Sequence, residues 1–177
     1  MRVPKCESAR RLAKVGQLVI YSDEFGVMDL PLTPLELKKL LIEQGFEVYR
    51  TIGNRVLLAE RVRDNLIMDS NVSALTGESL AARLTVRAQQ ADFHGDIESQ
   101  LFARAAEVAK PAIERGYKEV DRTVVPIVDP GDKTRTLDTW YEISVQRPVD
   151  TMPALVEELR FLLEVEKVAV DIRGATG

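Results

Sequence analysis

The hydrophobic pattern of residues 80–173 most restricts the fold, because its period changes repeatedly between two residues and about 3.6 residues. A period of two is typical of a strand with one buried face, and a period near 3.6 is typical of an amphipathic helix. The pattern predicts strands at residues 82–89, 117–129, 137–147 and 168–172, and helices from about residue 96 to Gly116 and from Thr151 onward. The chain should therefore combine a sheet with packed helices.

The predicted order in this region is strand, helix, strand, strand, helix, strand. It resembles the ferredoxin-like split β-α-β plait, in which helices cover one face of an antiparallel sheet. We therefore expect an α+β protein with a ferredoxin-like βαββαβ arrangement in residues 80–173. Residues 1–77 would form an N-terminal helix and hairpin extension that shares the core, and residues 78–177 would form the ferredoxin-like domain.

The extension contains the clearest local signal. Thr33-Pro34-Leu35-Glu36 has the pattern of a helix capping box, and Gly45 suits the end of the helix, so a helix is predicted over residues 34–44. Two strands, 46–52 and 55–62, follow around a Gly-Asn turn. Residues 64–77 are ambiguous, because a short apolar run precedes residues typical of turns at 69–71. A further short helix at 5–15 and a strand at 17–21 are predicted upstream.

A second topology follows if residues 168–172 continue the last helix. The order from Thr33 is then helix, three strands, helix, two strands, helix, written αβββαββα. This order, together with the acidic charge and small size, resembles the small chaperones of type III secretion and the sensory-transduction regulators that share their fold. The resemblance covers residues 33–167 and contains no sequence motif, so it assigns no functional residue.

Composition excludes several classes of protein. One cysteine among 177 residues cannot form an internal disulfide, and no window approaches ~18 uncharged apolar residues, so a membrane span is not expected. The basic N-terminus lacks the apolar run of a signal peptide, which favours a cytoplasmic location. The net charge of −4 argues against nucleic acid as the main partner.

No cofactor motif is present. The sequence has neither a phosphate-binding P-loop nor a G-x-G-x-x-G pattern, and one cysteine with one histidine cannot build a zinc finger. The remaining candidate for chemistry is the loop containing Asp92, His94 and Asp96, whose carboxylates and imidazole are suited to a metal or to acid–base catalysis. The competing interpretation is that Asp96 caps the next helix.

The strand at 82–89 places Arg83 and Arg87 on one face, and Arg122 and Arg147 are candidates to extend a basic surface onto neighbouring strands. Such a face would suit RNA, but these strands lack the aromatic residues on which RNA bases stack. The strands also carry acidic residues that dilute the charge: Glu119, Asp121 and Glu142. Cross-strand ion pairs explain the same residues.

Trp140 lies on the opposite side of its strand from Tyr141, so it should be on the polar sheet face if Tyr141 faces the core. A large aromatic residue on such a face often marks a contact surface, and coverage of Trp140 by the N-terminal helix explains it equally well. We therefore predict a non-catalytic binding module of the regulatory, adaptor or chaperone-like kind, which binds a protein partner or itself, as a dimer. Its contact surface would be the sheet face near Trp140 or an edge strand that contains Pro126. The alternative is a small-molecule or metal-assisted enzyme that uses the His94 loop.

Overall fold

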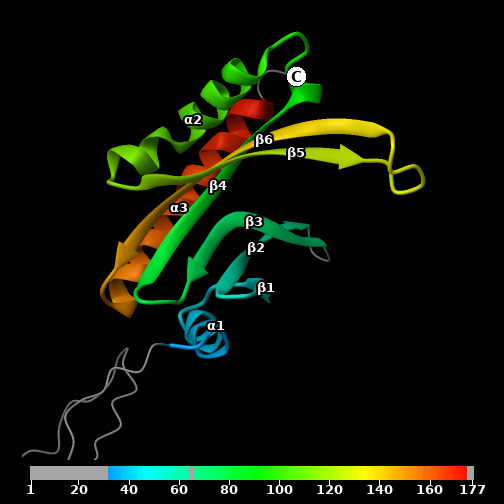
Figure 1. Ribbon diagram of the computed structural model, residues 1–177. Coiled ribbons are helices and arrows are strands. Elements are labelled where there is room, and N and C mark those ends of the chain that lie inside the picture. Colours follow the sequence, from blue (N-terminus) through cyan, green and yellow to red (C-terminus); the bar gives the residue numbers. More distant parts are fainter. Residues whose placement is uncertain (1–31, 64–65, 175–177) are drawn as a thin grey trace, which may run out of the picture.

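The computed structural model describes residues 32–63 and 66–174, and the elements predicted upstream at 5–21 lie outside them. The described chain is an α+β protein with a six-stranded antiparallel sheet, three α-helices and one short 3₁₀ helix (Figure 1). The elements, in chain order, are α1 (Pro34–Glu43), β1 (Val48–Ile52), β2 (Arg55–Arg63), β3 (Leu66–Leu75), β4 (Leu80–Gln89), η1 (Gln90–Asp92), α2 (Glu98–Glu114), β5 (Lys118–Val128), β6 (Thr136–Val149) and α3 (Met152–Gly174).

The sheet has the strand order β1-β2-β3-β4-β6-β5, and every neighbouring pair is antiparallel. The first four strands follow one another as hairpins, whereas β6 lies between β4 and β5. The connection from β4 through α2 to β5 crosses over β6. The predicted edge position of Pro126 is confirmed, because β5 is the last strand of the sheet.

Local sequence signals explain where α1 begins and ends. The Thr33 hydroxyl accepts a hydrogen bond from the Glu36 backbone N–H at 3.3 Å, and the Thr33 backbone N–H donates to the Glu36 carboxylate at 2.9 Å. The predicted capping box is therefore confirmed. Gly45 has a φ of 87°, which is unfavourable for residues with a side chain and allows the chain to leave the helix.

The core lies on one face of the sheet and joins all three helices. Alternate residues of the central strands belong to a single buried cluster, as the predicted period of two requires. Its strand members on β2, β3, β4 and β6 include Val56, Leu58, Val72, Ala74, Ala82, Leu84, Val86, Ala88, Ile143 and Val145. Leu37 and Leu41 of α1, Leu101 of α2 and Leu159 of α3 belong to the same cluster. The three helices therefore cover the same sheet face.

The last predicted strand is wrong. Residues 168–172 belong to α3, which continues to Gly174, so the ferredoxin-like arrangement lacks its final strand. Two physical reasons account for this: no proline or glycine interrupts the helix after Pro153 until Gly174, and the free side of β4 is already paired with β3. Helices on one face of an antiparallel sheet are as predicted.

The order observed from α1 is helix, four strands, helix, two strands, helix. It differs from the second predicted topology by one strand, β3, which includes residues 69–71, where the sequence indicated a turn. The proposed boundary between residues 77 and 78 falls in the turn that joins β3 to β4. Among the described residues, no helix is both long and apolar enough to cross a membrane.

Candidate binding surface on the open sheet face

The sheet face opposite the helices carries a second set of side chains, which we call the open face. Cross-strand pairs place these residues together: Leu57 with Ser73, Ser73 with Arg83, Thr85 with Ser144, Arg87 with Glu142, and Gln89 with Trp140. None of them belongs to the core cluster that the helices cover. The open face combines small buried residues with long charged ones: Ser73 is 1% exposed and Ser144 is 5% exposed.

Arg87 lies at the centre of the polar contacts on this face. Its guanidinium carbon lies 4.5 Å from the centre of the Trp140 ring, in a cation–π contact. Its Nη2 donates to Asn71 Oδ1 at 2.8 Å, and its Nε lies 3.6 Å from Glu142 Oε1. The indole N–H of Trp140 donates to Asp138 at 3.0 Å. Neighbouring polar groups thus hold both side chains of the cation–π pair, Arg87 and Trp140, in place.

Arg55 and Arg83 form a second cationic pair on the open face. Arg55 Nη2 donates to the Ser73 hydroxyl at 3.3 Å, and Ser73 pairs across the strands with Arg83. Arg83 lies 3.7 Å from Asp121, which is too long for a strong charged hydrogen bond. Burial, and then the positive charge of Arg55, lower the pKa of the Arg83 guanidinium, against the opposing effect of Asp121.

A break in the sheet connects the two faces. The β3–β4 pairing ends at Val72 and Leu84, and β3 curves away from β4 beyond that point (Figure 1). Asn71 lies at the break, where it contacts Arg87 from the open face and Glu166 from α3. Glu166 Oε1 accepts hydrogen bonds from the backbone N–H and the side-chain amide of Asn71, both at 2.7 Å.

Burial raises the pKa of Glu166, although both hydrogen bonds from Asn71 lower it, and the charges of Glu60 and Asp69 raise it further. Burial also raises the pKa of Asp69, and the positive charge of Arg50 opposes this most strongly. Two carboxyl groups beside the break therefore hold their protons more tightly than exposed carboxyl groups do.

The predicted binding residues are divided among different parts of the molecule. Arg83, Arg87 and Trp140 lie on the open face, as the alternation predicted. Arg122 and Arg147 do not join them. Arg122 lies over the Phe102 ring of α2 at 5.0 Å, and Arg147 Nη1 donates to Glu158 of α3 at 2.9 Å. Both therefore lie on the helix-covered face, because their strand positions have the opposite parity.

The loop with Asp92, His94 and Asp96 does not bring these side chains into one site. Asp92 and His94 are exposed, while the Asp96 carboxylate pairs with Arg104 at 2.6 Å. Asp96 is also not the cap of α2, since that position is Ile97, whose backbone N–H donates to Gln100 at 2.9 Å. Among the described residues, no three histidine, cysteine or acidic side chains are grouped closely enough to hold a metal ion.

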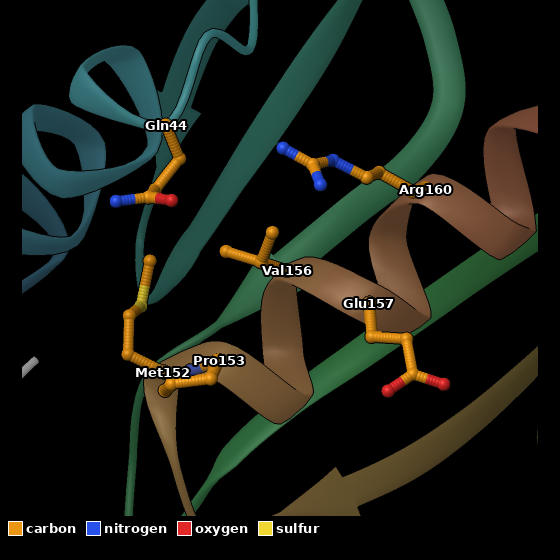
Figure 2. A pocket seen from close by; sticks show the side chains of 6 residues that line it. All are labelled: Gln44, Met152, Pro153, Val156, Glu157 and Arg160. Carbon is orange, nitrogen blue, oxygen red and sulfur yellow. The ribbon is translucent and has the colours of Figure 1, made fainter.

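Within the described part of the chain, open hollows lie along α3 on the helix-covered side, and they include a smaller and a larger one. One, of about 350 Å³, separates the end of α1 from the start of α3, where Gln44 faces Met152 and Val156 (Figure 2). The other, of about 590 Å³, lies between α3 and β2 and includes Glu60 and Glu166. Arg160 lines both hollows. Neither contains a grouping of side chains with an evident catalytic role.

Three polar residues of the open face were not identified from the sequence: Arg55, Asn71 and Ser73. Arg55 begins β2 directly after the Gly53-Asn54 turn, so strand alternation from that turn could have placed it. Asn71 and Ser73 could not have been placed in this way, because β3 has an irregular register. Three of its residues, 70–72, lie opposite the single residue Leu58.

Comparison with known proteins gives no match to a protein family, to a curated protein or to a solved structure. The fold and the surface together define an α+β protein with helices on one sheet face and an arginine-rich polar surface on the other.

Proposed function

We propose that this protein is a non-catalytic binding module, of the regulatory, adaptor or chaperone-like kind, that acts as a dimer. Its contact surface is the open face. The observation that carries the proposal is the arrangement of the helices, which cover one sheet face and leave Trp140, Arg83 and Arg87 together on the other.

The side chains at this surface favour recognition of a protein. A tryptophan and neighbouring arginines are the residue types that most often dominate the energy of protein interfaces. Trp140 is half-buried and is held by contacts with Arg87 and Asp138. Because this side chain is already ordered, it loses little conformational entropy when a partner binds to it.

The edge of the sheet offers a second contact region. The outer strand β5 exposes Val120, Val124 and Val128, which are 51%, 43% and 40% exposed. An outer strand also has backbone N–H and C=O groups available for pairing with another chain. Self-association through β5 would extend the sheet and place the open faces of two copies side by side.

The proposal is tested by comparing Trp140→Ala with a matched control, Leu137→Ala. Leu137 is an exposed apolar residue on the same strand, but it has the opposite parity and therefore lies on the other side of the strand. Light scattering gives the oligomeric mass, and capture from the source cell with mass spectrometry identifies co-purifying proteins. We expect Trp140→Ala to weaken association at least tenfold and to leave the far-UV circular dichroism unchanged.

The control variant should retain both the mass and the captured partner. If the oligomeric mass and partner capture both survive the Trp140 change, the open face is not the contact surface. If both variants weaken association equally, the tip of the β5–β6 hairpin is the contact region instead.

A further inference from the structure

We infer that Arg55 and Arg83, on either side of Ser73, bind a side-chain carboxylate in an acidic segment of a protein partner. This inference names the chemistry recognised by the proposed binding surface, and it rests on that proposal for the protein nature of the ligand. The two arginines come from β2 and β4, and Ser73 lies between them on β3.

Neither of these two arginines has a close carboxylate partner in the described chain. Several other arginines do: Arg104 with Asp96 at 2.6 Å, Arg122 with Glu119 at 2.9 Å and Arg115 with Glu158 at 3.0 Å. Arg55 forms no ion pair with any carboxylate of the described residues, and Arg83 has only Asp121, at 3.7 Å. Neither of these two neighbouring cations therefore has a carboxylate closer than 3.7 Å among the described residues.

The hydrogen-bonding groups of the two arginines also lack partners within the described chain. The Nε atoms of Arg55 and Arg83 are buried, and no atom in the described part of the chain accepts a hydrogen bond from either. Buried donors in proteins are nearly always paired, so these two unpaired Nε atoms show that the described chain supplies too few acceptors for the two guanidinium groups. A guanidinium presents its N–H groups as a planar fork that matches the two oxygens of a carboxylate.

Charge around the site favours a peptide carboxylate over the backbone of a nucleic acid. The open face also carries Asp69, Asp121 and Glu142, which would repel a regular row of phosphates. A single carboxylate on a peptide can enter between the arginines without approaching all three acids. Trp140 is the only tryptophan of the chain, and Arg87 already covers its ring, so it is poorly placed to stack bases.

The site is tested by isothermal titration calorimetry of the full-length protein with a hexaglutamate peptide, with hexaglutamine as the uncharged probe. The variant is the double change Arg55→Gln and Arg83→Gln. The matched control is a double change of two arginines outside the open face, Arg104→Gln and Arg122→Gln, which removes the same net charge. We expect hexaglutamate binding that hexaglutamine lacks, weakened at least tenfold in the first variant and less than threefold in the control.

Single Arg83→Lys and Arg55→Lys changes provide a second set of variants, since they keep the charge and remove the planar fork. They should weaken binding by about three- to tenfold, and circular dichroism should show the native fold. Lysine variants that bind as tightly as the wild type would overturn the bidentate site.

Other results would also overturn the inference. Equal weakening in the site and control variants would mean that only net charge matters. Tighter binding of inorganic phosphate or of single-stranded RNA than of hexaglutamate would mean that the ligand class is wrong. Absence of hexaglutamate binding, with Trp140-dependent partner capture intact, would remove the carboxylate site and leave the proposed function standing.

Discussion

Glu158 shows how this chain accommodates a buried carboxylate. Its side chain is 7% exposed, and it accepts hydrogen bonds from Arg115 at 3.0 Å, Arg147 at 2.9 Å and the Tyr117 hydroxyl at 2.9 Å. Burial, followed by the hydrogen bond to Glu158, raises the pKa of Tyr117, so this hydroxyl remains protonated and donates at neutral pH. These contacts join α3 to the end of α2 and to β6.

Glu158→Ala should lower the free energy of unfolding by about 2–4 kcal/mol, because it leaves the buried Tyr117 hydroxyl without an acceptor and removes the buried carboxylate that pairs with Arg115 and Arg147. Glu157→Ala is the matched control, since Glu157 contacts the same Arg115 at 2.8 Å but is 74% exposed. An exposed ion pair contributes about 0–1 kcal/mol. Urea denaturation measures the free energy of unfolding of both variants. Equal losses in the two variants would contradict the importance of burial.

At the scale of elements, α3 and β3 are joined where the sheet opens. Glu166 is the α3 residue at this junction, and its two hydrogen bonds come from Asn71. Because burial raises the pKa of Glu166 above the ordinary value of 4.5, the folded state binds this proton more tightly than the unfolded state does. The stability from this group is fully present below pH 4.5 and is lost as the pH rises through the raised pKa.

Glu166→Gln should therefore change the pH dependence of stability. The amide keeps an oxygen acceptor for Asn71 but carries no charge at any pH. Relative to this variant, the wild-type protein should lose stability as the pH rises above 4.5 and through the raised pKa of Glu166, as measured by urea titrations at several pH values. Glu164→Gln, at a position that is 71% exposed on the same helix, is the control. If stability depends on pH in the same way in both variants, burial of Glu166 is not the cause of the pH dependence.

Local sequence signals were sufficient for elements with their own start, stop or period. The capping box defined α1, and alternation placed Arg83, Arg87 and Trp140 on one sheet face. The strand predicted at 168–172 failed because three large apolar residues at every second position, Val168, Val170 and Ile172, fit both a strand and a continuing helix. Tertiary structure decided between them, since β3 already occupies the free side of β4.

The candidate site was only partly predictable for the same reason. Arg55 and Arg83 are 28 residues apart in sequence and meet only because β3 joins β2 to β4. The position of Asn71 depends on the irregular pairing of β3, which no pattern in the sequence predicts. Arg147 was misplaced although it has the same parity as the core residues Ile143 and Val145 on its strand. Arg122 was misplaced because it follows an irregularity in β5 between Glu119 and Asp121, which the sequence does not specify.

At the scale of the whole molecule, one core connects both halves of the chain. Leu37 and Leu41 from α1 belong to the same buried cluster as Leu155 and Leu159 from α3. The turn between β3 and β4 joins two neighbouring strands of one sheet. A chain with a shared core of this kind should unfold as a single cooperative unit.

The Leu37→Ala variant tests this cooperativity, because Leu37 is fully buried and lies in the N-terminal half. It should lower the free energy of unfolding by about 2–5 kcal/mol. Unfolding followed by Trp140 fluorescence, in the C-terminal half, should shift as much as unfolding followed by circular dichroism. Leu35→Ala, at a position that is 62% exposed on the same helix, should shift neither. If Leu37→Ala leaves the unfolding transition followed by Trp140 fluorescence unchanged, the two halves of the chain unfold as independent units.

The strand order also affects how the chain is made. During translation β4 meets β3 at once, whereas its other neighbour, β6, emerges only after α2 and β5. At about 5–20 residues per second, the roughly fifty residues between them take several seconds to synthesise. Throughout this interval the nascent chain exposes an unpaired strand edge beside the ribosome. A transcript that ends before β6 would leave this edge permanently open, so its product should aggregate or require degradation.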